Sequence, residues 1–146
     1  MKFLLLFLLT LSVHGAGFWT LSGLEKANIY VKNELSFVKP ETIESIKAKM
    51  KVTLKTNGIL IGQQDSPTLM IVLEELSNDD MFYIYVKLAL GEEVQTFRVD
   101  KSATFALTYD SNDFIEADTD ELDSEILESV DYLLSHFSEQ YEDDNE

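Results

Sequence analysis

Seven apolar residues at helical spacing near the C-terminus constrain the fold of this chain more than any other feature. They are Leu122, Ile126, Val130, Leu133, Leu134, Phe137 and Tyr141. Because residues three and four apart lie on one side of a helix, these side chains form one apolar stripe. A stripe of this length is stable only when it is covered, so we expect the helix to pack on a sheet. Asp118 and Glu121 predict a capping box at its start.

A second amphipathic helix is predicted to begin at Pro40, a residue that is common at the first helical position. The spacing of the apolar residues places Ile43, Ile46, Met50 and Leu54 on one face. Asn57-Gly58 is a typical helix end. The remaining surface carries Lys47, Lys49, Lys51 and Lys55. We expect these cations to solvate the helix or to balance acidic charge elsewhere in the fold.

Four segments have the alternation or the apolar content of strands, at residues 27–38, 68–76, 81–90 and 102–109. The first is expected to bend near Asn33, and the second is apolar on both faces, as is typical of a central strand. Gly91 predicts a bulge or a turn before a further extended segment at 94–99. The sequence therefore predicts an α+β fold of order β-α-β-β-β-α. In this fold an antiparallel sheet of about four strands has both helices packed on one face.

The first 15 residues have the order of a secretory signal peptide. Lys2 precedes an apolar run, and small residues follow at Gly15 and Ala16. The run is shorter than the roughly 20 residues that a membrane-spanning helix needs. We expect cleavage after Gly15 and a periplasmic or secreted product without a transmembrane segment. Residues 16–141 then form a single domain, followed by an acidic, frayed tail at 142–146.

Charge is distributed unevenly along the chain and limits the choice of partner. The chain has 27 acidic and 11 basic residues, for a formal net charge of −16, and no Lys or Arg occurs after Lys101. Nucleic-acid binding requires clustered cations, so this composition argues against it.

Residues suited to catalysis are few or scattered. The chain has no Cys, and the mature chain would have one His, His136, which is expected to be a partly exposed helix residue. Glu74 and Glu75 would lie on opposite faces of a strand and would not act on one substrate. We therefore expect a protein without enzymatic activity and without a cofactor. The alternative is a hydrolase that uses carboxylates from separate segments.

Four acidic residues near the last helix offer a possible cation site. Asp110, Asp113, Asp118 and Asp120 provide carboxylates, the ligands that Ca²⁺ prefers. The EF-hand loop is excluded because Ile115 stands where the loop requires Gly. The first expectation is a solvated turn followed by a helix cap, and an exported calcium-binding protein is the alternative.

Three tyrosines predict an interaction surface. Tyr83, Tyr85 and Tyr109 fall on strands, where an uncovered sheet face would expose them. Tyrosine combines contact area with a polar end and is enriched in protein interfaces. The favoured function is thus an exported, non-enzymatic domain that binds another protein or is associated with the cell envelope. Its oligomeric state is open.

The segments described above resemble small exported bacterial proteins of unassigned function. The resemblance is carried by the Lys-rich helix ending in Thr-Asn-Gly-Ile at 56–59, the strands at 66–73 and 81–90, and the helix at 130–141. The element order is also similar to that of the lipoprotein partner of the outer-membrane lipopolysaccharide-assembly barrel. That family is anchored through a lipidated Cys, which this chain lacks, so no functional residue is assigned from it.

Overall fold

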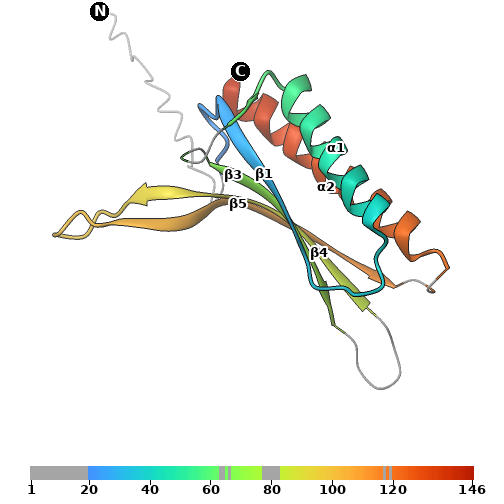
Figure 1. Ribbon diagram of the computed structural model, residues 1–146. Helices are drawn as coiled ribbons and strands as arrows, with labels where there is room; N and C mark the ends of the chain where they lie inside the picture. The colour runs from blue at the N-terminus through green and yellow to red at the C-terminus, as the bar shows by residue number, and fades with distance from the viewer. Residues whose placement is uncertain (1–19, 63–64, 66, 77–82, 117, 119) are drawn as a thin grey trace, which may run out of the picture.

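The protein folds as one five-stranded mixed sheet with both helices on the same face, as the computed structural model shows (Figure 1). The structure describes residues 20–62, 65, 67–76, 83–116, 118 and 120–146. The expected signal peptide and the start of the strand expected at 81–90 lie outside these residues. The elements in chain order are β1 (Lys26–Asn33), α1 (Pro40–Thr56), β2 (Leu60–Ile61), β3 (Thr68–Glu75), β4 (Tyr83–Gln95), β5 (Ala103–Glu116) and α2 (Leu122–Asn145).

The α+β class and the placement of the helices are confirmed, whereas the antiparallel sheet and the strand count are corrected. The strand order is β2-β1-β3-β4-β5, in which β1 pairs in parallel with both β2 and β3. The pairs β3–β4 and β4–β5 are antiparallel. The parallel pairs arise because α1 returns the chain to the end of the sheet at which β1 begins. The short strand β2, which the sequence pattern did not predict, adds the edge next to β1.

The apolar stripes of the two helices meet the inward face of the sheet. Ile46, Met50 and Leu54 of α1 are buried, and Ile43 is partly buried. The predicted residues Leu122 to Phe137 of the α2 stripe are all buried, and Tyr141 is partly buried. Residues at alternate positions of the central strands complete this core, namely Leu69, Ile71, Leu73, Ile84, Val86 and Leu88. The amphipathic pattern of each helix therefore predicted its buried face correctly.

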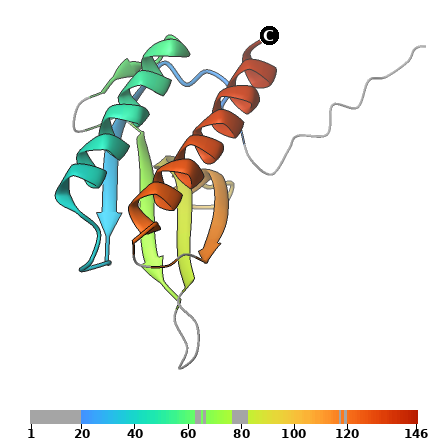
Figure 2. The same cartoon turned by 90° about the vertical axis from the view of Figure 1, so that its right-hand side faces the viewer.

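The helices run side by side in the same direction (Figure 2). Side-chain contacts join them at three levels. Thr42 Oγ1 donates to Asp123 Oδ1 at 2.7 Å near the start of both helices. In the middle, Lys49 Nζ lies 2.7 Å from Asp131 Oδ2. Toward the C-terminal ends, Asn57 Nδ2 donates to Ser138 Oγ at 2.9 Å. Lys49 is thus one of the predicted cations that balances the acidic helix.

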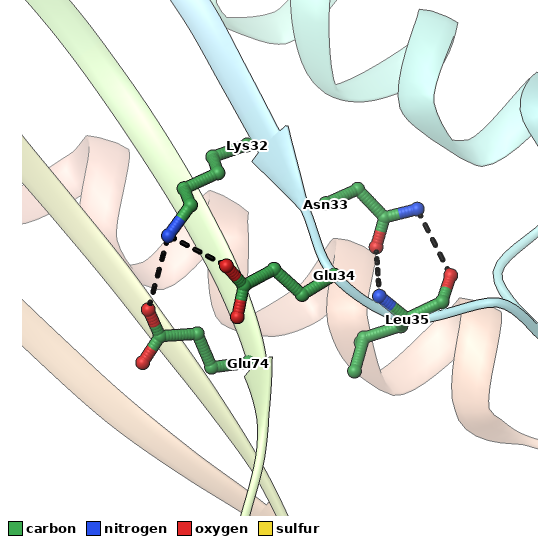
Figure 3. Close-up of polar contacts among 5 residues, drawn as sticks. All are labelled: Lys32, Asn33, Glu34, Leu35 and Glu74. Carbon is green, nitrogen blue, oxygen red and sulfur yellow. Dashed lines mark hydrogen bonds and ion pairs between the residues drawn. The ribbon is translucent and has the colours of Figure 1, made fainter.

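The ends of several elements differ from the sequence prediction. β1 ends at Asn33. Asn33 Oδ1 accepts a hydrogen bond from Leu35 N–H, and Asn33 Nδ2 donates one to Leu35 O (Figure 3). These local side-chain bonds compete with the hydrogen bonds of the sheet. α1 ends as expected, because Gly58 takes φ 73° and Ile59 N–H donates to Leu54 O. α2 begins at Leu122 with Glu121 as its N-cap, and no side chain caps it, so the predicted capping box is wrong.

The last residues of the chain are helical, not frayed. α2 continues through Asn145, and its end holds the segment before β1. Asp144 Oδ2 accepts from Leu21 N–H at 2.7 Å, and Asn145 Oδ1 accepts from Gly23 N–H at 2.9 Å. These contacts satisfy backbone groups in the loop and fix the helix end against it.

The last two strands are longer than the sequence predicted. β4 continues through Gly91 to Gln95. A register shift between Leu90 and Gly91 confirms a bulge at this point, and the register skips Thr108 of β5, which is the extra residue. β5 extends past Tyr109 to Glu116, so the expected turn at 110–113 is part of a strand. Polar residues occupy this part of β5, and they do not show the apolar alternation by which a strand is recognised.

Candidate binding surface

One face of the sheet has no helix over it and forms the candidate binding surface. Both helices lie on the other side of the sheet (Figures 1 and 2). The uncovered face is formed by the strand residues that alternate with the core positions. We call this surface the open face; its members include Tyr30, Lys32, Met70, Val72, Glu74, Tyr83, Tyr85, Lys87, Phe105, Asp110 and Phe114.

Aromatic side chains contribute much of the exposed area of the open face. Tyr85 pairs with Phe114 across β4 and β5, and their ring centroids lie 5.1 Å apart. Phe114 is 61% exposed and Tyr30 is 55% exposed. Tyr83 and Tyr85 are half-buried at this end of the sheet. Exposed aromatic area of this kind is enriched at protein interfaces.

Tyr109 was expected on the same surface, and the structure places it in the core instead. Its side chain is 5% exposed and its ring meets that of Phe137 edge to face. Burial raises the pKa of the Tyr109 hydroxyl. The sequence-predicted surface therefore keeps Tyr83 and Tyr85 and loses Tyr109.

Charged residues of the open face are paired with one another. Lys87 Nζ lies 2.9 Å from Asp110 Oδ2, and both side chains are largely buried. Lys32 Nζ lies 2.7 Å from Glu34 Oε1 and 3.7 Å from Glu74 Oε1 (Figure 3). The hydrogen bond to Glu34 is the main cause that raises the pKa of Lys32.

Val72 shows how these charges pack on apolar surface. It is only 8% exposed although it lies on the face without a helix. Its register partners are Lys32 on β1 and Lys87 on β4. Long lysine side chains cover apolar neighbours with their methylene groups while their charged ends reach a carboxylate. The open face thus carries aromatic residues toward its ends, whereas its centre is covered by lysine side chains that form ion pairs.

The hairpin between β4 and β5 projects beyond the other strands and ends in exposed apolar residues (Figure 1). The last pair that joins β4 to β3 is Thr68 with Gly91, so only β4 and β5 continue from there. Phe97 and Val99 at its tip are fully exposed. The tip is closed by the Lys101 N–H, which donates to Arg98 O at 2.9 Å. The sequence pattern predicts an extended segment at 94–99 and gives no sign of this exposure.

The candidate cation ligands are not brought together. Asp110 lies on the open face beside Lys87, whereas Asp113 faces α2 and accepts from Ser129 Oγ at 2.8 Å. Asp118 and Asp120 are exposed in the connection to α2. Among the residues that the structure describes, no group of three or more His, Asp or Glu side chains is arranged to hold a metal ion.

His136 and the acidic pairs do not form a reactive cluster. His136 is exposed on α2, with Nδ1 2.9 Å from Tyr132 O and its ring 4.2 Å from the Tyr132 ring. Glu74 forms an ion pair with Lys32 on the open face, whereas Glu75 lies on the opposite side of the same strand. No helix within the described part of the chain is both long and apolar enough to cross a membrane.

Comparisons with known proteins place the chain in no family. No family model and no curated protein matches it. A solved structure described as a minor lipoprotein from Acinetobacter baumannii is distantly similar, with a TM-score of 0.35 and 13% sequence identity. The match covers 80% of this chain and 91% of that chain.

Proposed function

We propose that this protein is an exported, non-enzymatic domain that binds another protein through the open face and the β4–β5 hairpin tip. The observation that carries this proposal is the uncovered sheet face with exposed Tyr30 and Phe114, continued by fully exposed Phe97 and Val99. Exposed aromatic and aliphatic groups that lie together on one side of a domain are typical of protein interaction sites.

The chemistry of the surface supports a binding role over catalysis. A hydrolytic site needs a nucleophile or a carboxylate pair that converges on one substrate. On the open face, Lys32 and Lys87 hold Glu74 and Asp110 in ion pairs. These carboxylates position the lysines over the sheet and leave the aromatic groups as the contact area.

Site-specific photo-crosslinking tests the binding surface. A photo-reactive residue replaces Tyr30 in one variant and Val52 in another, because Val52 on α1 is similarly exposed at 63% but lies on the helix side. Crosslinking in intact cells is expected to join one defined partner to position 30 and none to position 52. Equal adducts from both positions would reject the open face as the binding site.

Serine substitutions provide the matched functional comparison. The Phe97→Ser/Val99→Ser variant should lose most of the crosslinked partner, whereas Val52→Ser should retain it. Both variants should keep the wild-type melting temperature within a few degrees, since exposed substitutions change stability by about 0.5 kcal/mol or less. Retention of the partner by the hairpin variant would exclude the tip from the site.

Export is tested by the intact mass of the protein recovered outside the cytoplasm. The small residues at Gly15 and Ala16 predict a mature chain that begins at Ala16. A recovered protein that retains residues 1–15 would contradict cleavage.

A further inference from the structure

The outer side of β5 is a sheet edge that is open to strand pairing. β5 is the last strand of the sheet, and on its outer side no described strand pairs with residues 110–116. Farther along, Thr108 O accepts from Thr20 N–H at 2.9 Å, so the edge is occupied there. Phe114 N–H donates to the side chain of Asp113 and not to β4. β5 also contains neither Lys nor Pro, two residues that commonly protect edge strands.

A groove of about 440 Å³ accompanies this edge. One wall is the edge strand itself and the other is the N-terminal half of α2. The lining residues are Asp113, Phe114, Ile115, Glu116, Glu125, Glu128, Ser129 and Tyr132. The groove therefore gives an added strand both backbone partners from β5 and a side wall from the helix.

The charge of the groove determines which kind of peptide segment can bind in it. The lining contains four carboxylates and no cation. In the described chain, no lysine or arginine lies within ion-pair distance of Glu116, Glu125 or Glu128. A second copy of this chain would place its own acidic groove against this one, in a protein with net charge −16. A cationic segment avoids that repulsion.

We propose that the β5 edge binds an extended segment of a protein partner in which Lys or Arg alternates with apolar residues. In an added strand, alternate side chains point to opposite faces of the sheet. One set faces the carboxylates Glu125 and Glu128 on α2, and the other extends the apolar surface at Phe114 and Tyr85. This inference rests on the proposed function and specifies the chemistry of the partner.

Synthetic peptides of defined sequence test the edge directly. The probe is a labelled, end-blocked heptapeptide that alternates Lys with Val, and binding to the mature protein is measured by fluorescence anisotropy. A Glu/Val peptide should not bind. A Lys/Val peptide with N-methylated valines keeps the charge but loses backbone donors, and it should bind at least tenfold more weakly. Equal binding of the methylated peptide would overturn strand addition in favour of general attraction between opposite charges.

A pair of isosteric variants tests the groove. Glu125→Gln/Glu128→Gln removes two charges inside it, and Glu139→Gln/Glu142→Gln removes two exposed charges from the other end of α2. The first variant should bind the Lys/Val peptide at least tenfold more weakly than the wild type does. The second variant should bind it less than threefold more weakly. Equal losses would overturn the assignment of the site.

Three further outcomes test this inference, and the last of them separates it from the proposed function. Hydrogen exchange should slow at the Asn112 and Phe114 amides when the peptide is bound, and unchanged exchange there would overturn edge pairing. Dimerisation of the free protein that blocks the peptide would assign the edge to a second copy and would also overturn it. If the Lys/Val peptide does not bind while crosslinking at position 30 still captures a partner, the edge proposal is rejected and the proposed function stands.

Discussion

Tyr109 of β5 and Phe137 of α2 pack edge to face in the core, with ring centroids 5.5 Å apart and planes at 90°. Phe137 is fully buried and Tyr109 is 5% exposed. This geometry places the positive ring edge of one residue against the negative face of the other and adds to the burial of both. The contact holds the acidic helix α2 on the last two strands and turns Tyr109 away from the open face.

The first prediction concerns this contact. Phe137→Ala should lower the free energy of unfolding by about 3–5 kcal/mol, because a buried aromatic ring is lost and a cavity remains. Glu139→Ala, at an exposed position of the same helix, should change it by about 0.5 kcal/mol or less. Urea unfolding followed by circular dichroism measures both. Similar losses in the two variants would mean that the buried face of α2 is assigned wrongly.

The helices were predicted well because their signal is local. The α2 stripe repeats at the helical period over the whole element, and all of its residues from Leu122 to Phe137 are buried. Tyr109 shows the limit of the same reasoning for strands. Its side chain faces inward because Leu90 is its partner across the bulge and β5 continues past it. Neither relationship is visible in the residues around Tyr109 alone.

The extent of β5 depended on contacts between residues distant in the sequence. Asp110 and Asp113 have the residue types of a turn. They occupy a strand because Lys87 meets one carboxylate and Ser129 meets the other, on opposite faces of the sheet. A similar dependence explains why the open edge and its groove were missed, since they form only when α2 packs beside β5.

The second prediction concerns Asp123, which joins the starts of the two helices. Burial acts to raise its pKa, but hydrogen bonds from Thr42 and Lys39 outweigh burial and hold the pKa below the usual value. Lys39 Nζ lies 3.0 Å from Asp123 Oδ2. Asp123→Asn should lower the free energy of unfolding at pH 7 by about 1–2 kcal/mol, because bonds to a charged acceptor are weakened.

The pH dependence of this contribution has a definite sign. Because the folded-state pKa of Asp123 is lowered, its stabilisation is present above the ordinary pKa of 3.8 and is lost as the pH falls through the folded value. The difference between wild type and Asp123→Asn should therefore shrink in urea melts below that pH. A difference that grows with acidification would contradict the role of the carboxylate.

The third prediction couples Gly91 of β4, which lies opposite the bulge, to Phe105 of β5. A Cβ atom on Gly91 would overlap Cζ of Phe105, so the ring covers the glycine and must move if a side chain is added. Gly91→Ala should destabilise the wild-type protein by about 0.5–1 kcal/mol, because the Phe105 ring must leave its preferred rotamer. In a Phe105→Ala background the same change should be neutral or stabilising, since alanine restricts the unfolded chain more than glycine. Thermal melts of the four variants form a double-mutant cycle, and additive effects would contradict the contact.

The last prediction concerns calcium. Asp110 and Asp113 point to opposite faces of the sheet, and each already has a partner in Lys87 or Ser129. A Ca²⁺ ion needs six to eight oxygen ligands around one point, which these carboxylates do not supply together. Added salt should raise the melting temperature only by screening the net charge of −16. CaCl₂ and MgCl₂ at equal ionic strength should therefore give the same shift in differential scanning calorimetry. A rise at micromolar Ca²⁺ that Mg²⁺ does not reproduce would contradict this and would require Asp110, Asp113, Asp118 and Asp120 to rearrange around an ion.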